Sequence, residues 1–370
     1  MSIILFIIIL LVLILAHEFG HFIVAKSAGI RVDEFGVGFP PRAKVLFQKG
    51  ETEYTFNWLP FGGFVRIFGE DPNEESMHGP DSARSMVNKP VLIQAAVLVA
   101  GVVFNMILAW LLLAAVFMFG TNITLNTPSE IAQAKNVELV VNYIAPNSPA
   151  AEAGLKTGDV IMSLTAGNSV LSDFTPEGAA SFIESHAPSA MELVLDRNGT
   201  EIKETVTPIQ GLSSDEPDRY YIGISMNLVG FLRYTNPIGA LYHGGALTID
   251  MTRFVWDGLI TFFRGLVTFS ADFSEVAGPI GIVGVVGQAA ASGLTSLLFL
   301  TALISINLAI INIMPVPALD GGRLLFLVIE TVSRRRIPPR VANAIHSTFF
   351  ALLILLIFVV SYFDVLRIWH

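Results

Sequence analysis

Four segments of the chain are long and apolar enough to cross a lipid bilayer, whose hydrocarbon core is about 30 Å thick. They cover approximately residues 3–24, 90–119, 294–314 and 349–365. Backbone amide groups find no water inside hydrocarbon, so segments of this kind must be α-helical. The composition agrees, because 53% of the residues are hydrophobic and only 14% are charged. The chain is therefore predicted to be a polytopic α-helical membrane protein with about four transmembrane helices.

The distribution of basic residues predicts which side of the membrane each loop occupies, because cytoplasmic loops are enriched in Lys and Arg. The loop 26–89 carries eight of them, and the short segment SRRRIPPR (333–340) is also basic, whereas the region 120–293 is acidic. Both basic loops are predicted to be cytoplasmic, and the acidic region and both termini extracytoplasmic. The first segment lacks a basic start and a small-residue cleavage site, so we expect it to remain as a span.

The extracytoplasmic region is predicted to hold a β-rich domain followed by an amphipathic helix. Strand and turn patterns recur between about 135 and 229, with a hairpin around RNGT (197–200) and a closing strand in RYYIGISMN. The segment 231–293 has apolar residues at helical spacing with charges interleaved, which favours a helix on the outer membrane surface over a fifth span. The predicted membrane part consists of residues 1–120 and 294–370. The inserted domain is predicted at 121–230 and the surface segment at 231–293.

The first cytoplasmic loop has the pattern of a β-hairpin sheet. EYTFNWLPFGGFVRIFGED (53–71) alternates aromatic and polar residues around a Pro-Phe-Gly-Gly turn, and a further strand pair is predicted around Lys49-Gly50. The aromatic residues favour a sheet that touches the membrane, but an ordinary cytoplasmic hairpin fits the pattern equally well.

Three ionisable residues lie inside the first span, in LILAHEFGHFIVAK (13–26). Such residues are costly in hydrocarbon and mark functional sites. His17 and His21 are four positions apart, so they share one helix face and can bind one metal ion, with Glu18 close enough to take a proton from a water that the metal activates. This H-E-x-x-H spacing is typical of zinc metalloproteases, although in a soluble helix the same five residues often match by chance.

A third metal ligand is needed, because catalytic zinc sites usually combine three protein ligands with one open position. Asp320 is the candidate, in NIMPVPALDGGR (312–323), where two prolines break the third span. At 1.5 Å per helical residue, His17 lies about 14 Å from Lys26 and Asp320 about 15 Å from Glu330, so both would lie at similar depth on the cytoplasmic side. The alternative is that Asp320 only caps the helix that follows.

HEFGH together with NIMPVPALDGG resembles the site-2 protease family of intramembrane metalloproteases, peptidase family M50, and more narrowly the bacterial regulator of sigma-E protease group. GVGFPP and residues 53–71 resemble that group's membrane-associated β-hairpin loop. SPAAEAGLKTGD resembles the ligand loop and helix of a PDZ domain, and EVAGPIGIVGVVGQAA (275–290) resembles the segment before the third span. Two features depart from the group, namely a single PDZ-like unit and the loop sequence Gly-Val-Gly-Phe-Pro in place of Gly-Phe-Gly-Pro.

The resemblance implies that His17, His21 and Asp320 bind Zn²⁺, that Glu18 is the general base, and that Asn312 holds the unwound substrate backbone. A capping amide beside the proline break is an equally good role for Asn312. Three further residues are predicted to contact substrate, at the same break and at the turn of the hairpin sheet, namely Pro315, Gly62 and Gly63. Interhelical hydrogen bonding is the expected role of two other amides in the spans, Asn105 and Asn307.

The predicted function is intramembrane proteolysis by a zinc metalloendopeptidase that cuts within transmembrane segments of single-span proteins, such as anti-sigma factors or remnant signal peptides. The predicted location is the bacterial inner membrane, in contact with membrane lipid, with the active site toward the cytoplasm and the PDZ domain outside, where it could bind a C-terminal peptide. A net charge of −9 disfavours nucleic acid as a partner, and the absence of cysteine excludes thiolate ligands.

The sequence is also compatible with two other classes of protein. The first is a non-catalytic membrane scaffold that binds a structural metal and presents a peptide-binding PDZ domain. Structural zinc sites fill all four positions with protein groups, so three ligands favour the enzyme. The second is a metal transporter, which would need ionisable residues along a path across several spans.

Overall fold

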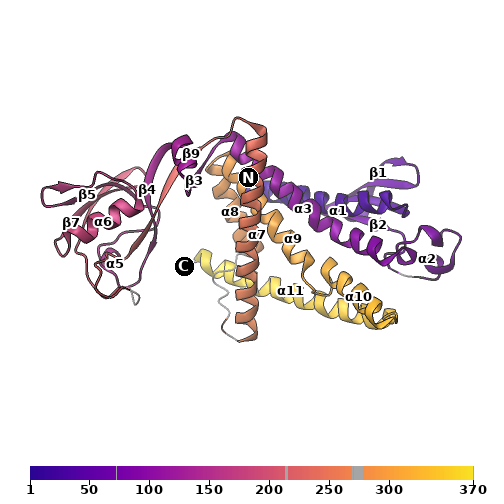
Figure 1. Ribbon diagram of the computed structural model, residues 1–370. Coiled ribbons are helices and arrows are strands. Elements are labelled where there is room, and N and C mark those ends of the chain that lie inside the picture. The colour runs from indigo at the N-terminus through magenta and orange to yellow at the C-terminus, as the bar shows by residue number, and fades with distance from the viewer. Residues whose placement is uncertain (72, 213–215, 269, 271–277, 370) are drawn as a thin grey trace. The chain divides into compact units, whose positions relative to one another are not determined.

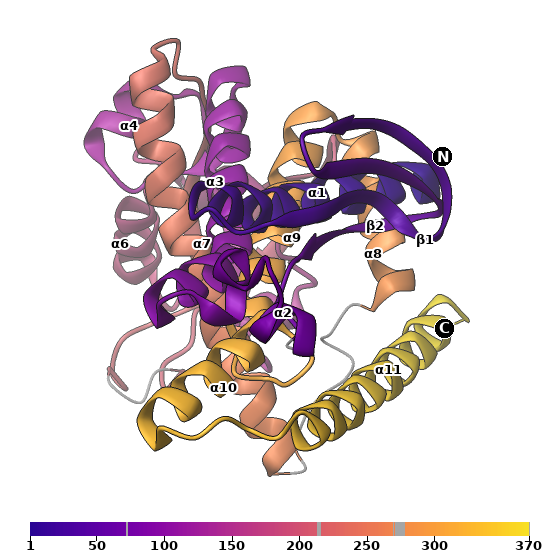
Figure 2. The ribbon, with the colours of Figure 1, turned by 90° about the vertical axis from the view of Figure 1, so that its right-hand side faces the viewer.

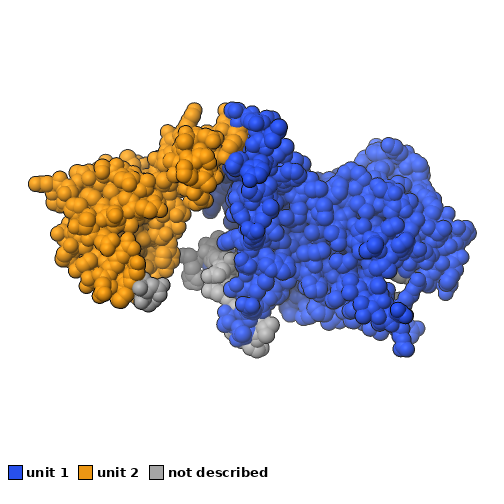
Figure 3. Space-filling model, viewed as in Figure 1, with its two compact units in different colours: residues 1–118, 235–370 blue, residues 119–234 orange. Residues whose placement is uncertain are grey.

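The computed structural model describes residues 1–71, 73–212, 216–268, 270 and 278–369. The chain divides into two compact units, one of residues 1–118 and 235–370 and one of residues 119–234 (Figure 3). We call them unit 1 and unit 2. The inserted domain predicted at 121–230 lies within unit 2.

Among the described residues, four helices are long and apolar enough to cross a membrane, in agreement with the sequence prediction (Figure 1). They are α1 (Ser2–Ser27), α3 (Val91–Phe119), α9 (Leu294–Ile313) and α11 (Pro339–Trp369). The fourth span is longer than predicted, because its apolar part covers Arg340–Leu366. Helix α9 ends two residues before Pro315, which cannot donate the hydrogen bond that a continuing helix would need.

Further helices connect these spans in unit 1 (Figures 1 and 2). They are α2 (Glu74–His78), two 3₁₀ turns η1 (Ser82–Arg84) and η2 (Met86–Asn88), α7 (Pro237–Val267), α8 (Pro279–Ala291) and α10 (Asp320–Ser333). The sequence segment 275–290 falls mainly on α8, and its first three residues lie outside the described part of the chain.

The loop between α1 and α3 forms one sheet from β1 (Val32–Lys49) and β2 (Thr52–Ile67), and the predicted turn at Lys49-Gly50 is confirmed. The sheet is folded further than a hairpin. Phe35 pairs with Tyr54 on one side and with Val65 on the other, so the first half of β1 lies between the two halves of β2. Residues 63–67 therefore form an outer strand of this sheet, which we call the edge segment.

The edge segment lies beside α1 (Figures 1 and 2). A Cβ atom on Gly63 would be 3.3 Å from Leu15 Cδ2, so the absence of a side chain lets this strand approach the helix closely. Ala25, Val65 and Val97 join one buried apolar cluster, which fixes the sheet against α1 and α3. The edge segment is thus held next to the helix that carries the H-E-x-x-H sequence.

Helix α7 confirms the helix predicted in the segment 231–293, and its packing goes beyond that prediction. Trp110 Nε1 on α3 donates a 2.7 Å hydrogen bond to the Leu241 carbonyl oxygen. A Cβ on Gly244 would lie 2.7 Å from the Ala114 nitrogen, and Val255 is buried in a cluster with Ala109 of α3 and with residues of α9. The helix therefore packs directly on two spans.

Asp364 of α11 holds the start of α8. Its side chain is only 2% exposed, and its two oxygens accept hydrogen bonds from the Gly278 N–H at 3.1 Å and the Gly281 N–H at 2.8 Å. The first N–H groups of a helix have no partner within the helix, and a carboxylate there also interacts favourably with the helix dipole. This contact ties the last span to the segment before the third span.

Unit 2 is an antiparallel sheet with short helices. Its strand order is β3-β9-β4-β5-β7-β8, with β6 paired to β5. The hairpin predicted around residues 197–200 is confirmed, whereas the closing strand starts only at Ile224. The elements are β3 (Thr121–Thr124), α4 (Pro128–Gln133), β4 (Lys135–Ile144), α5 (Pro149–Glu152), β5 (Val160–Ala166), β6 (Ser169–Val170), α6 (Pro176–His186), β7 (Met191–Arg197), β8 (Thr200–Val206) and β9 (Ile224–Leu232).

An ion pair between buried Asp159 and partly exposed Arg197 stabilises unit 2 and makes its stability depend on pH. Burial by itself raises the pKa of Asp159, but two 2.7 Å hydrogen bonds from Arg197 and one from the Lys156 N–H hold that pKa below its ordinary value of 3.8. Because the folded-state pKa is lowered, the stabilisation is complete above pH 3.8 and is lost as the pH falls further.

We expect Arg197→Met to destabilise unit 2 near neutral pH, because the buried carboxylate loses its partner. Hydrogen exchange of β5 and β7 in the full-length protein measures the effect, with the exposed Lys203→Met as control. Unchanged protection of these strands at neutral pH would contradict the prediction.

Candidate metal centre

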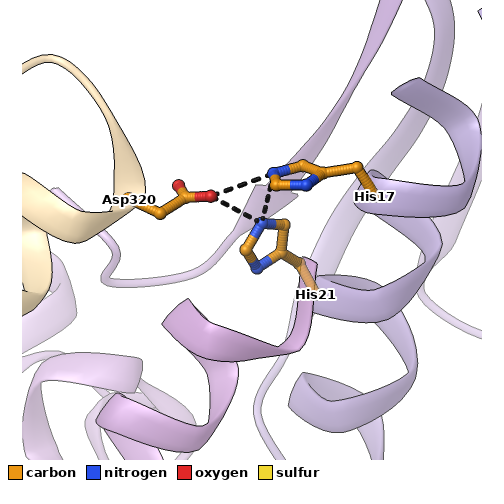
Figure 4. Close-up of side chains that lie close together, drawn as sticks. All are labelled: His17, His21 and Asp320. Atoms are coloured by element: carbon orange, nitrogen blue, oxygen red, sulfur yellow. Dashed lines mark hydrogen bonds and ion pairs between the residues drawn. The ribbon is translucent and has the colours of Figure 1, made fainter. Parts of the chain in front are cut away.

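His17 and His21 project from the same face of α1, one helical turn apart (Figure 4). Both side chains are buried, and their Nε2 atoms lie 3.1 Å from each other. Two imidazole nitrogens this close, in a largely apolar helix, require a shared partner to offset the cost of burial. The four-residue spacing thus brings the two rings together on one face of the helix.

Asp320 completes the group, although it lies 303 positions from His17. Its Oδ2 is 2.9 Å from His17 Nε2 and 3.4 Å from His21 Nε2 (Figure 4). Tetrahedral ligands about 2.0–2.1 Å from one zinc ion lie about 3.3 Å from one another, so the three atoms fit three corners of a zinc site. His17, His21 and Asp320 form the group of His and acidic side chains that, among the described residues, lie close enough together to hold a metal ion.

The role of Asp320 as a simple helix cap is excluded by the local geometry. Helix α10 has Leu319 at the cap position, and Asp320 is its first helical residue. Gly321 and Gly322 follow, and a Cβ on either would overlap the backbone of residues 313–317. The Pro-x-Pro break and the two glycines therefore bring the start of α10 close enough to α1 for its carboxylate to reach the histidines.

The carbonyl oxygen of Val97 fixes the orientation of His21. It lies 2.7 Å from His21 Nδ1, which must donate the hydrogen bond because a carbonyl can only accept. Nε2 of the neutral ring then keeps its lone pair and points toward His17 and Asp320. Metal-binding histidines usually have such a partner on the second nitrogen, and it tunes both orientation and basicity.

Asn105 of α3 is the corresponding partner of His17, with its Nδ2 3.3 Å from His17 Nδ1. Asn105 is fully buried, and its Oδ1 has no hydrogen-bond partner. The interhelical role predicted for Asn105 is confirmed, but its partner could not be read from the sequence. The same prediction is wrong for Asn307, whose amide donates to the Leu303 carbonyl of its own helix.

Gly101 lets α3 pass directly beside the two histidines. A Cβ on Gly101 would overlap His21 Nε2 and would lie 2.6 Å from His17 Cε1. We expect Gly101→Ala to displace both rings and to lower zinc affinity by at least about tenfold, measured by competition with a chelator. Gly258→Ala on α7 is the control, since a Cβ there has no neighbour within 4 Å. Equal zinc affinity in the two variants would refute this packing argument.

Glu18 lies between the histidines and the edge segment of the sheet. Its Cγ is 3.9 Å from the position that a Cβ on Gly63 would take, so the side chain lies against this segment. The predicted general base and the predicted strand edge therefore meet at one place. Gly62 and Gly63 are buried there, while Asn312 is half-buried and Pro315 exposed at the end of α9.

An ion pair beside the site was not predicted from the sequence. Arg323, one turn after Asp320, contacts Glu70 and lies 3.2 Å from Asp71, which joins α10 to the loop after β2. Burial raises the pKa of Glu70 even though Arg323 acts against it. The same loop and residues 64–68 line a cavity of about 470 Å³ along β2. No local pattern could have predicted this contact, since the partners are about 250 positions apart.

Comparisons with known proteins show to which family this chain belongs. Residues 5–356 match Peptidase family M50. A candidate zinc metalloprotease of Nostoc sp. is 36% identical over 361 residues, covering 96% of this chain and 93% of that protein. Zinc metalloprotease RasP of Shouchella clausii is 30% identical over 443 aligned residues, and RasP of Oceanobacillus iheyensis 29% over 444, with at least 98% of each chain covered.

The helices and the His-His-Asp group, together with these similarities, define a multi-pass membrane zinc metalloprotease. The chain belongs to peptidase family M50, the site-2 protease family, and its cofactor is Zn²⁺.

Proposed function

We propose that the protein hydrolyses peptide bonds inside the transmembrane segments of single-span membrane proteins. The observation that carries this proposal is the place of the metal group. His17 and His21 are buried within a membrane-spanning helix, and Asp320 reaches them from the broken end of another span. A substrate cut at this site must therefore enter the membrane region of the protein.

The three side chains fit zinc by donor type and spacing, so His17, His21 and Asp320 are the proposed ligands. Bound zinc supplies Lewis acidity, which polarises a peptide carbonyl and lowers the pKa of water to about 7. Three protein ligands leave one coordination position open, as catalytic sites require. A structural metal in a non-catalytic scaffold would need a fourth protein ligand, and the described residues bring only three together.

Glu18 is the proposed general base and acid. Its carboxylate lies beside the metal group and next to the edge segment, so it can take the proton from the attacking water. The same group can then donate that proton to the nitrogen of the leaving amine.

The edge segment is the proposed binding site for unwound substrate. All backbone amides of a transmembrane helix are bonded internally, so cleavage requires an extended stretch. A strand added along residues 63–67 would satisfy those amides and place a carbonyl near Glu18, as in β-strand addition. Gly62 and Gly63 would allow close approach, and Asn312 and Pro315, at the end of α9, would contact the same extended stretch.

Unit 2 is proposed to be a PDZ domain on the extracytoplasmic side of a bacterial inner membrane. The metal site would lie toward the cytoplasm, and α7 would lie at the extracytoplasmic surface of the same membrane. Its sheet and short helices, and the basic loops around β1 and after α10, support this arrangement. Unit 2 would bind the C-terminal peptide of a substrate or exclude bulky outer domains. Anti-sigma factors and remnant signal peptides are the proposed substrate classes.

Asn105 is expected to support zinc binding through His17. To bind zinc through Nε2, the neutral ring must carry its proton on Nδ1, which then needs an acceptor. Rotation of the Asn105 amide would present the unpartnered Oδ1 to that proton. We therefore expect Asn105→Leu to lower zinc affinity by about 10–100-fold, whereas Asn105→Asp, which keeps an acceptor, loses less. Equal zinc affinity in the Leu variant and the native protein would remove this role.

The proposed activity is tested with purified protein in liposomes and a single-span reporter. We expect cleavage products whose new termini, located by mass spectrometry, lie inside the reporter's span. A chelator should stop the reaction and zinc should restore it. Cutting only outside the span, or cutting that resists the chelator, would overturn the proposal. Membrane peptides that accumulate in cells carrying Glu18→Gln would then identify the natural substrates.

A further inference from the structure

We propose that His346, on the last span α11, is a positioning residue that holds Asp320 in place. The inference rests on the proposed role of Asp320 as a zinc ligand. None of the three proposed ligands lies on α11, so this role would give the last span a part in building the metal site.

His346 binds the loop that leads into Asp320. The Ala318 N–H donates a 2.8 Å hydrogen bond to His346 Nδ1, which joins residues 28 positions apart. Ala318 has φ +86°, a conformation that residues with a side chain rarely adopt. Residues held in such conformations persist only where the surrounding structure fixes them. The imidazole of His346 supplies one of the contacts that do so.

The loop transmits this contact to the carboxylate. Only residues 314–319 separate α9 from α10, and the loop is closed by hydrogen bonds from the Val316 N–H to Met314 at 2.7 Å and from the Leu319 N–H to Val316 at 3.1 Å. A Cβ on Gly322 would lie 2.6 Å from Pro317 Cα, so the start of α10 is packed onto this loop. A change in the Ala318 backbone therefore moves Asp320, two residues later.

The ring of His346 also contacts α10 itself. It packs edge-to-face against Phe326, with ring centroids 5.2 Å apart and planes at 88°. One side chain of α11 thus touches both the loop before Asp320 and the helix that begins with it. Metal ligands depend on such supporting groups, whose removal commonly costs 10–100-fold in metal affinity.

The test compares His346→Leu, which removes the acceptor, with His346→Asn, whose Oδ1 can replace Nδ1. Full-length protein in detergent is titrated with a zinc chelator, and kcat and KM are measured with the single-span reporter. We expect His346→Leu to lower zinc affinity about tenfold or more and to lower kcat with KM little changed. His346→Asn should keep most of both. Phe350→Leu, at an exposed position of the same helix, is the control.

Native zinc affinity in His346→Leu would overturn the inference, as would equal losses in His346→Leu and His346→Asn. A folding defect is detected by size-exclusion chromatography and thermal melting. If the Leu variant does not fold, His346→Gln replaces it, because its longer side chain moves the acceptor away from Ala318. Asp320→Asn is measured alongside. Retained zinc in that variant would reject the proposed ligand set, whereas lost zinc with an unaffected His346→Leu would reject only the role of His346.

Discussion

Replacing Glu18 with glutamine is expected to abolish peptide-bond cleavage while zinc stays bound. Glutamine has nearly the same shape but cannot take a proton from water, and general acid–base catalysis contributes about 10²–10⁴-fold to such rates. Since Glu18 is not one of the three grouped ligands, the metal site should survive. Cleavage of a single-span reporter and zinc content, measured on the same purified sample, test both halves of the prediction.

Glu75 is an exposed residue of α2, and Glu75→Gln is the matched control because it makes the same chemical change away from the site. Full activity in Glu18→Gln would remove the proposed base. Loss of zinc together with activity would instead mean that Glu18 contributes to the metal site itself.

Replacing Asp320 with asparagine is expected to weaken zinc binding by at least about 100-fold, more than the loss of a supporting group. A neutral amide oxygen is a poorer zinc ligand than a carboxylate, and His17 and His21 alone leave two positions open. Zinc retention against a chelator of known affinity measures this loss, and cleavage should fall in parallel.

Asp71→Asn controls for the removal of a nearby negative charge, since Asp71 is 92% exposed and lies close to Arg323. Unchanged zinc content in the Asp320→Asn variant would mean that the Asp320 carboxylate of the native protein does not bind the metal. The two predictions separate the roles at the site, because one variant should keep the metal without activity and the other should lose the metal.

The features that the sequence predicted well are those encoded locally. Hydropathy marks a span by composition alone, and the four-residue spacing of His17 and His21 guarantees a shared face once α1 is helical. Asp320 could be matched to them because the distance of each position from the predicted cytoplasmic end of its helix could be counted along the sequence. The length of α11 was underestimated, since its first turns contain polar residues that hydropathy does not favour.

The contacts that were missed depend on how distant helices pack. Asn105 was recognised as a polar group in a span, but only the packing of α3 on α1 places it against His17. His346 lies near the start of the last span, where a lone histidine gives no sign of its partner Ala318. The fold-back of β1 between the two halves of β2 was missed for the same reason, because alternation along a strand does not specify its neighbours.

The strands at the two ends of unit 2 are neighbours in its sheet, since Thr121 of β3 pairs with Leu232 of β9. Paired antiparallel residues have Cα atoms about 5 Å apart, a gap that a two-residue turn can close. The residues from Asn122 to Phe231 could thus be deleted, and a short turn could join Thr121 to Leu232. The helices on either side would not be stretched. Evolution or an engineer could exchange such a module, or omit it, while the hydrolytic machinery stays intact.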